Sequence, residues 1–164
     1  MKKLLIVLTL MLMSFSSLTY SAQFTPGNLV VVRIGTGSGS LSNASTAVFL
    51  DEYTTAGVLV QSIAMPTAVS GLNFPLTNSG TATSEAQLTL SADLQYLILA
   101  GYSAVPGILN VAATSSASTP RVIGRVDING NINTSTTITD AFSANNIRSA
   151  VTSDGTAFWS AGGN

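Results

Sequence analysis

A repeat with a spacing of 61 residues constrains the fold of this chain more than any other feature. Residues 84–93 (SEAQLTLSAD) align without a gap on residues 145–154 (NNIRSAVTSD), and an acid of the turn falls in register. The strands expected after these turns, ending at residues 99–101 (LAG) and 160–162 (SAG), align at the same spacing. Because one such unit cannot bury its own apolar face, the pattern predicts several stacked copies of a small β unit.

A second pair of similar segments supplies the remaining strands of the repeat. Residues 47–63 and 121–138 both show a glycine-containing turn between a strand that bears acids and a strand rich in β-branched residues. The assembled repeat is a four-stranded antiparallel meander of about 60 residues, which is the size and topology of a propeller blade. We therefore predict an all-β fold, a partial, truncated β-propeller. Its expected parts are a part blade at about 28–63, a whole blade at about 85–138 and a part blade at about 146–164.

A β-sandwich of about ten strands is the alternative architecture, because the length and the turn spacing suit it as well. Periodicity and turn residues predict no helix, and the expected strands are residues 28–34, 47–53, 58–63, 86–91, 95–101, 121–127, 131–138, 147–152 and 156–160. Asn129-Gly130 and Asp154-Gly155 lie between such strands and predict hairpin turns. Residues 102–120 are expected to form a long surface loop with a small strand at 108–111.

The beginning of the chain has the pattern of an export signal. Lys2 and Lys3 precede an uncharged, apolar run at residues 4–13, which is too short to span a bilayer comfortably, and small residues follow at 14–22. We predict a signal peptide at 1–22 and a mature domain at 23–164 that is secreted, periplasmic or on the cell surface. No membrane attachment is expected after cleavage.

The predicted propeller is incomplete, because a propeller has at least four blades. The sequence stops in mid-turn at residues 160–164 (SAGGN), and we expect it to be the front part of a longer protein. The other expectation is self-association, since an incomplete ring leaves strand edges unpaired.

The residue types that are missing exclude several kinds of chemistry. Without His or Cys, the chain cannot form Ser-His-Asp or Cys-His catalytic sets or His/Cys zinc sites. The predicted mature domain carries four arginines against seven acids, so it lacks the basic surface of a nucleic-acid-binding protein. Any enzyme built from this chain must use carboxylates, tyrosine or arginine.

Two loops resemble ligand-binding motifs only in part, and no cofactor or metal is expected. Residues 35–39 (GTGSG) lack the lysine and the following helix of a phosphate-binding loop. Residues 127–138 lack the glycine and the final glutamate of a calcium loop. Asp51-Glu52 is the single adjacent pair of acids, but neighbouring side chains of a strand point to opposite faces. The pair therefore cannot form a two-carboxylate site alone, and we expect it to keep an edge strand soluble.

The aligned copies also predict a ligand site. If residues 85–91 and 146–152 are the innermost strands of two blades, then Glu85, Gln87, Asn146 and Arg148 occupy corresponding positions and line a central channel. The alternative is structural, in which the four side chains are solvated or pair with one another.

Five segments resemble the opening of a family of secreted, functionally uncharacterised bacterial proteins that are predicted to form β-propellers. They are residues 24–35, 48–63, 80–93, 121–127 and 145–155. The resemblance implies a propeller fold and an exported protein, and it brings no catalytic residues. Two functions remain open: a non-enzymatic binding or scaffold module for an unknown extracellular ligand or protein, and the N-terminal fragment of an extracellular polysaccharide hydrolase or lyase.

Overall fold

The computed structural model describes residues 23–163, and the predicted signal peptide lies outside them. The described residues form ten strands and one short 3₁₀ helix, and all strand pairings are antiparallel. The prediction of an all-β fold with antiparallel sheets is confirmed. The described part of the chain forms no closed ring, and its packed sheets also fit the sandwich-like alternative. The elements are β1 (Leu29–Ile34), β2 (Ser45–Tyr53), β3 (Leu59–Ala64), β4 (Thr77–Ser79), β5 (Thr89–Leu90), β6 (Tyr96–Tyr102), η1 (Val111–Ala113), β7 (Arg121–Asp127), β8 (Ile132–Ile138), β9 (Ile147–Val151) and β10 (Trp159–Gly162).

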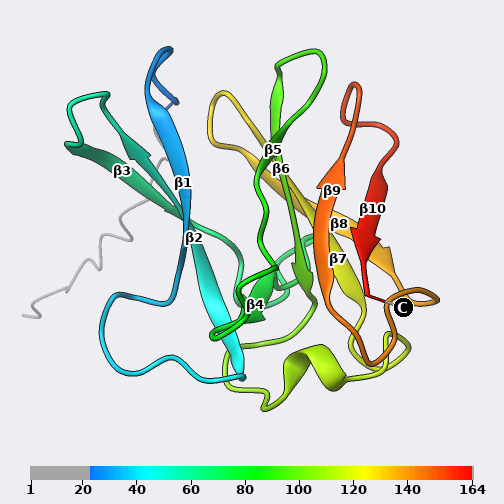
Figure 1. Ribbon diagram of the computed structural model, residues 1–164. Coiled ribbons are helices and arrows are strands. Elements are labelled where there is room, and N and C mark those ends of the chain that lie inside the picture. The colour runs from blue at the N-terminus through cyan, green and yellow to red at the C-terminus, as the bar shows by residue number, and fades with distance from the viewer. Residues whose placement is uncertain (1–22, 164) are drawn as a thin grey trace, which may run out of the picture.

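The strands form three groups that stand side by side (Figure 1). In the first group β2 lies between β1 and β3. In the second, β5, β6, β7 and β8 pair in chain order as a four-stranded meander. In the third, β9 and β10 form a hairpin. The short strand β4 joins the first two groups, because it pairs with the start of β2 and the end of β6.

Alternate side chains of β6 face the two neighbouring groups. Leu99 is fully buried in an apolar cluster with Val48 and Leu50 of β2. Ile98 is fully buried in a second cluster, with Ile147 of β9. Because successive side chains of a strand point to opposite faces, the middle group is covered on both sides. A sheet in a two-layer sandwich buries one face only.

The Asn129-Gly130 turn joins β7 and β8 as predicted. Gly130 has a φ of +75°, which glycine adopts at no steric cost. The carboxylate of Asp127 accepts hydrogen bonds from the backbone amides of Asn129 and Asn131, each 2.9 Å long. This aspartate therefore stabilises the hairpin turn.

Two acidic turns have the same local geometry. Oδ1 of Asp93 and Oδ1 of Asp154 each accept a hydrogen bond from the amide two residues further on, at 3.1 and 3.0 Å. The residue after each acid is left-handed, with a φ of +61° at Leu94 and +79° at Gly155. Glycine favours that conformation and leucine does not. Positions that align in the sequence thus adopt one backbone conformation despite different residue types.

The segment between β6 and β7 differs from its prediction. The strand expected at 108–111 is wrong, because the backbone at Asn110 is left-handed and Val111 begins η1 instead. Val111 and Ser116 are buried, so this part of the segment packs against the rest of the domain and is not a fully exposed loop. Ser45 fixes the beginning of the segment, since its hydroxyl donates to the carbonyl of Val105 (2.6 Å).

Strand β4 was not predicted, and its residues are polar. All of them are buried. The hydroxyl of Thr77 donates to the carbonyl of Ala104 (2.9 Å), and Nδ2 of Asn78 donates to the carbonyl of Ala100 (3.2 Å). These bonds pair the buried hydroxyl of Thr77 and the amide nitrogen of Asn78, whereas Oδ1 of Asn78 has no hydrogen-bond partner among the described residues.

Candidate functional site

The four residues predicted to line a ligand site lie near β5 and β9, and the structure brings them together in two pairs. Nδ2 of Asn146 donates to Oε1 of Glu85, and the backbone amide of Gln87 donates to the carbonyl of Arg148 (3.2 Å). Glu85 and Asn146 are half-buried, whereas Gln87 and Arg148 are exposed. Of the four side chains, those of Gln87 and Arg148 are therefore the ones open to a ligand.

Glu85 connects three elements through its carboxylate. Besides the bond from Asn146, it accepts hydrogen bonds from the hydroxyl of Tyr102 (2.6 Å) and from the backbone amide of Ser79 (3.0 Å). Tyr102 ends β6, Ser79 ends β4 and Asn146 directly precedes β9. The carboxylate thus fixes the junction of these strands, which is the structural alternative named above for Glu85 and Asn146.

Arg121 continues this network into the interior and is fully buried. Its guanidinium lies over the ring of Tyr102, with Cζ 4.8 Å from the ring centroid. Nη1 donates to the carbonyl of Thr119 (2.8 Å), and Nη2 lies 2.7–3.2 Å from four further carbonyl oxygens. Those four belong to Ala112, Thr114, Phe142 and Asn145. Arg121 therefore holds the segment before β7 against the segment before β9.

Burial shifts the pKa values of both Tyr102 and Arg121. Burial is the main cause that raises the pKa of the Tyr102 hydroxyl far above its usual value, and the bond to Glu85 raises it further. Burial also lowers the pKa of Arg121, although Tyr102 and Glu85 act in the opposite direction. Tyr102 is consequently a neutral hydrogen-bond donor at physiological pH, and it is unsuited to act as a base.

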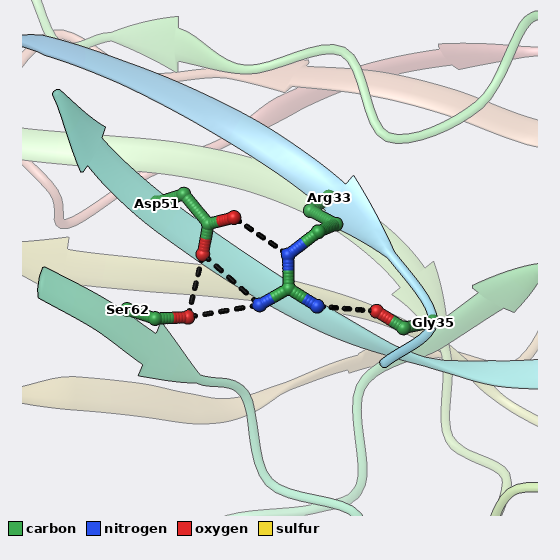
Figure 2. Close-up of polar contacts among 4 residues, drawn as sticks. All are labelled: Arg33, Gly35, Asp51 and Ser62. Atoms are coloured by element: carbon green, nitrogen blue, oxygen red, sulfur yellow. Dashed lines mark hydrogen bonds and ion pairs between the residues drawn. The ribbon is translucent and has the colours of Figure 1, made fainter. Parts of the chain in front are cut away.

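The Asp51-Glu52 pair does not lie on an edge strand. It belongs to β2, which pairs with β1 on one side and β3 on the other, so the expected edge-strand role is wrong. Figure 2 shows Asp51 held by the guanidinium of Arg33 on β1 and by the hydroxyl of Ser62 on β3. Nε of Arg33 donates to Oδ2 (2.6 Å), Nη2 donates to Oδ1 (3.2 Å), and the Ser62 hydroxyl donates to Oδ1 (2.5 Å).

Glu52 is fully buried and has different partners. One of its oxygens accepts hydrogen bonds from the amide of Thr25 (2.8 Å) and from Nδ2 of Asn28 (2.6 Å), and the other accepts one from Nε2 of Gln61 (2.6 Å). The separate partners agree with the prediction that the two acids point to opposite faces. Glu52 therefore ties the segment before β1 to the first sheet.

We expect the free energy of unfolding to fall as the pH drops below about 4.5, the ordinary range of carboxyl groups. Burial by itself would raise the pKa of both Asp51 and Glu52, but their hydrogen bonds, with the charge of Arg33 at Asp51, lower both pKa values below the ordinary ones. A carboxylate with a lowered folded pKa stabilises the fold above its unfolded pKa, and that contribution is lost as the pH falls through the folded pKa.

Urea denaturation at pH 7, 5, 4 and 3 measures the effect. The E52Q variant is expected to be less stable at pH 7 and to lose less stability on acidification than the parent protein does. The D140N variant, which alters an exposed acid, should follow the parent curve. A parent protein as stable at pH 3 as at pH 7 would contradict the assignment.

Comparison of the chain with protein-family models, with curated proteins and with solved structures found no match. The resemblance to the exported propeller family remains an expectation based on the segments quoted above. The function therefore has to be argued from the residues of this chain.

The sequence alone did not indicate that Tyr102 would donate to Glu85 or that Arg121 would stack on Tyr102. One pattern could have indicated part of the network: residues 121–125 (RVIGR) have an arginine at each end of a short apolar strand segment. Since residues two apart share a face, Arg121 and Arg125 point the same way, on the face that also carries Ile123.

Proposed function

We propose that this chain is an exported, non-enzymatic binding or scaffold module of the β-propeller type, whose ligand contacts the exposed edge formed by Gln87 and Arg148. The export part of the proposal rests on the sequence pattern of the first 22 residues. The module part rests on how the inner strands of the second and third groups meet.

The observation that carries the proposal is that β5 and β9 run side by side in the same direction. The hydroxyl of Thr89 donates to the carbonyl of Ala150 (2.7 Å), a residue 61 positions later in the chain. The backbone amide of Gln87 meets Arg148 at that same spacing, and the amide of Asp93 donates to the carbonyl of Ser153 (3.0 Å). Neighbouring blades of a propeller place corresponding inner strands around the channel in this way.

The layering supports the same proposal. Both faces of the β5–β8 meander are covered by other strand groups. A blade in a ring has neighbours on both faces, whereas a sandwich sheet has one. The hydrogen bond at the acidic turns of Asp93 and Asp154 further supports treatment of the two segments as copies.

The engaged carboxylates favour binding over catalysis. Asp51 is paired with Arg33, and Glu52 and Glu85 each accept hydrogen bonds from three groups. Glycoside hydrolysis needs two carboxyl groups facing one another across a substrate, one of which must exchange a proton. Acids that already fix strands are poorly placed for that task.

The test is binding to a panel of immobilised extracellular polysaccharides and proteins, with assays for new reducing ends and for unsaturated products. We expect saturable binding to at least one polymer without cleavage. The Q87A/R148A variant should lose that binding and keep its stability within about 0.5 kcal/mol, because both side chains are exposed. The T139A/D140A variant, altered at exposed residues next to β8, is the matched control. Product release would instead favour the polysaccharide hydrolase or lyase, and binding that survives Q87A/R148A would refute the proposed edge.

Self-association is the second contact that this module offers. In the described residues β3 and β10 each pair with one strand only, so backbone groups on their other side are open to a second copy. Sedimentation velocity over a range of protein concentrations measures it.

A further inference from the structure

A pocket of about 190 Å³ lies between the β7–β8 hairpin and the turn before β10. Its lining combines one cation, several hydroxyl and amide groups, and an apolar floor. The residues that line it are Ile123, Arg125, Asn133, Ser135, Thr136, Gly155, Thr156 and Phe158. At about 30 Å³ for each water molecule, the volume corresponds to roughly six waters, the size of one sugar ring.

The charge of the pocket comes from Arg125, and no acid of residues 23–163 lines it. The acids closest in sequence to the lining residues Arg125 and Gly155 are Asp127 and Asp154, and both accept hydrogen bonds within their own turns. Asp127 accepts hydrogen bonds from Asn131, and Asp154 accepts them from both the amide and the hydroxyl of Thr156 (3.0 and 2.7 Å). The pocket is therefore suited to an anionic group.

The guanidinium of Arg125 is held in a fixed orientation. It stacks on the ring of Tyr96, with Cζ 4.8 Å from the ring centroid, and Nη1 donates to the carbonyl of Gly155 (2.6 Å). An added Cβ at Gly155 would lie 2.7 Å from the Tyr96 ring and 3.0 Å from Nη1 of Arg125, so the glycine makes room for this stack. Fixing the side chain in advance lowers the entropic cost of ligand binding.

The other side of the guanidinium remains available. Among the residues that the structure describes, the hydrogen bond of the Arg125 guanidinium is made by Nη1, which leaves Nε and Nη2 without a partner. Together these two groups form the fork that binds both oxygens of a carboxylate. Asn133 lies directly opposite Arg125 on β8, and its Oδ1 already accepts a bond from Ser135 (2.8 Å), which leaves its amide nitrogen as a donor.

We propose that this pocket binds a small hydroxylated carboxylate, of the size and chemistry of one uronic acid residue. The carboxylate pairs with Nε and Nη2 of Arg125, the hydroxyls contact Asn133 and Thr136, and the ring lies on Phe158. Such a ligand can be a free acid sugar or one residue of an acidic polysaccharide. The pocket is lined by neither Gln87 nor Arg148, so this inference does not depend on the ligand site proposed above.

The test is titration of the folded protein with D-glucuronate, followed by backbone amide chemical shifts. Saturable shifts at Asn133, Ser135 and Thr156 are expected, and D-glucose should bind at least about tenfold more weakly, as expected for loss of a charge-assisted pair. A trimer of uronic acid that binds more tightly than the monomer would identify a polymer as the source. Equal affinity would identify the free acid. Absence of saturation, or equal binding of glucose and glucuronate, would overturn the proposal.

Variants separate the guanidinium fork from general charge effects. R125Q is expected to weaken glucuronate binding at least about tenfold, and R125K should recover little, because an ammonium lacks the fork. T139D changes the net charge by the same amount as R125Q at an exposed position outside the pocket, and it should bind as the parent does. Parent-like binding by R125K, measured on protein with an unchanged amide spectrum, would refute the bidentate contact.

Discussion

Replacement of Arg121 by alanine should lower the free energy of unfolding by about 3–5 kcal/mol, a large part of the stability of an average domain. Removal of the guanidinium leaves the carbonyls of Ala112, Thr114, Phe142 and Asn145 without their shared donor. A buried polar group without a partner costs about 1–3 kcal/mol, and some of these carbonyls can regain water. Among the described residues no carboxylate pairs with Arg121, so the loss comes from hydrogen bonds and packing.

Urea denaturation measures this effect, with R148A as the matched variant. Arg148 is exposed, and its replacement should change stability by no more than about 0.5 kcal/mol. If R121A does not fold, R121K provides the measurement, since its ammonium reaches some of the carbonyls and should retain part of the stability. Equal stability of R121A and the parent would contradict the role given to this arginine.

Much of the strand pattern was predictable because turn chemistry is local. Asn129-Gly130 predicts its hairpin from two residues, since glycine at the left-handed position suffices to reverse the chain. Short apolar or β-branched runs bounded by turn residues similarly located β2, β6 and β9 to within a few residues. These features depend on neighbours in the sequence.

The features that the sequence did not predict correctly depend on contacts between residues far apart in the chain. Thr77 and Asn78 lie in a short polar stretch that reads as a loop, and they become a strand because carbonyls of distant residues accept their side-chain hydrogen bonds. Asp51 and Glu52 look like surface acids, yet distant partners such as Arg33 and Gln61 satisfy them inside the sheet. A single sequence does not show which distant donors meet which acceptors, so buried polar residues are the least predictable part of this fold.

The candidate site was likewise predictable in its strand positions but not in its side-chain contacts. The 61-residue spacing was enough to predict that the strands of Gln87 and Arg148 would correspond, and their backbones do meet. It could not show that Glu85 would be engaged by Tyr102, because that contact depends on how β6 packs against the segment before β5. The spacing of the repeat predicts which strands lie next to each other. Which hydrogen-bond partners each side chain finds depends on how the strands pack.

Truncation of either neighbouring residue on β6 should be strongly destabilising, and this result would distinguish the stacked arrangement from a two-layer sandwich. Leu99 and Ile98 are both fully buried, in separate clusters on opposite faces of the strand. We expect L99A and I98A each to lower the free energy of unfolding by about 2–5 kcal/mol, the usual cost of a large-to-small change in a packed core. In a two-layer sandwich one of two successive residues faces solvent, and its truncation would cost no more than about 0.5 kcal/mol.

Urea denaturation of the two variants provides this comparison, and L94A is the control, because Leu94 is 69 % exposed. A second measurement identifies which group each residue supports. Hydrogen exchange in I98A should accelerate mainly in β9 and β10, whereas L99A should accelerate exchange mainly in β1–β3, since each cavity opens toward a different neighbour. If one of the two truncations is nearly neutral, then the middle sheet has a single buried face. In that case the propeller-type proposal fails and a two-layer sandwich replaces it.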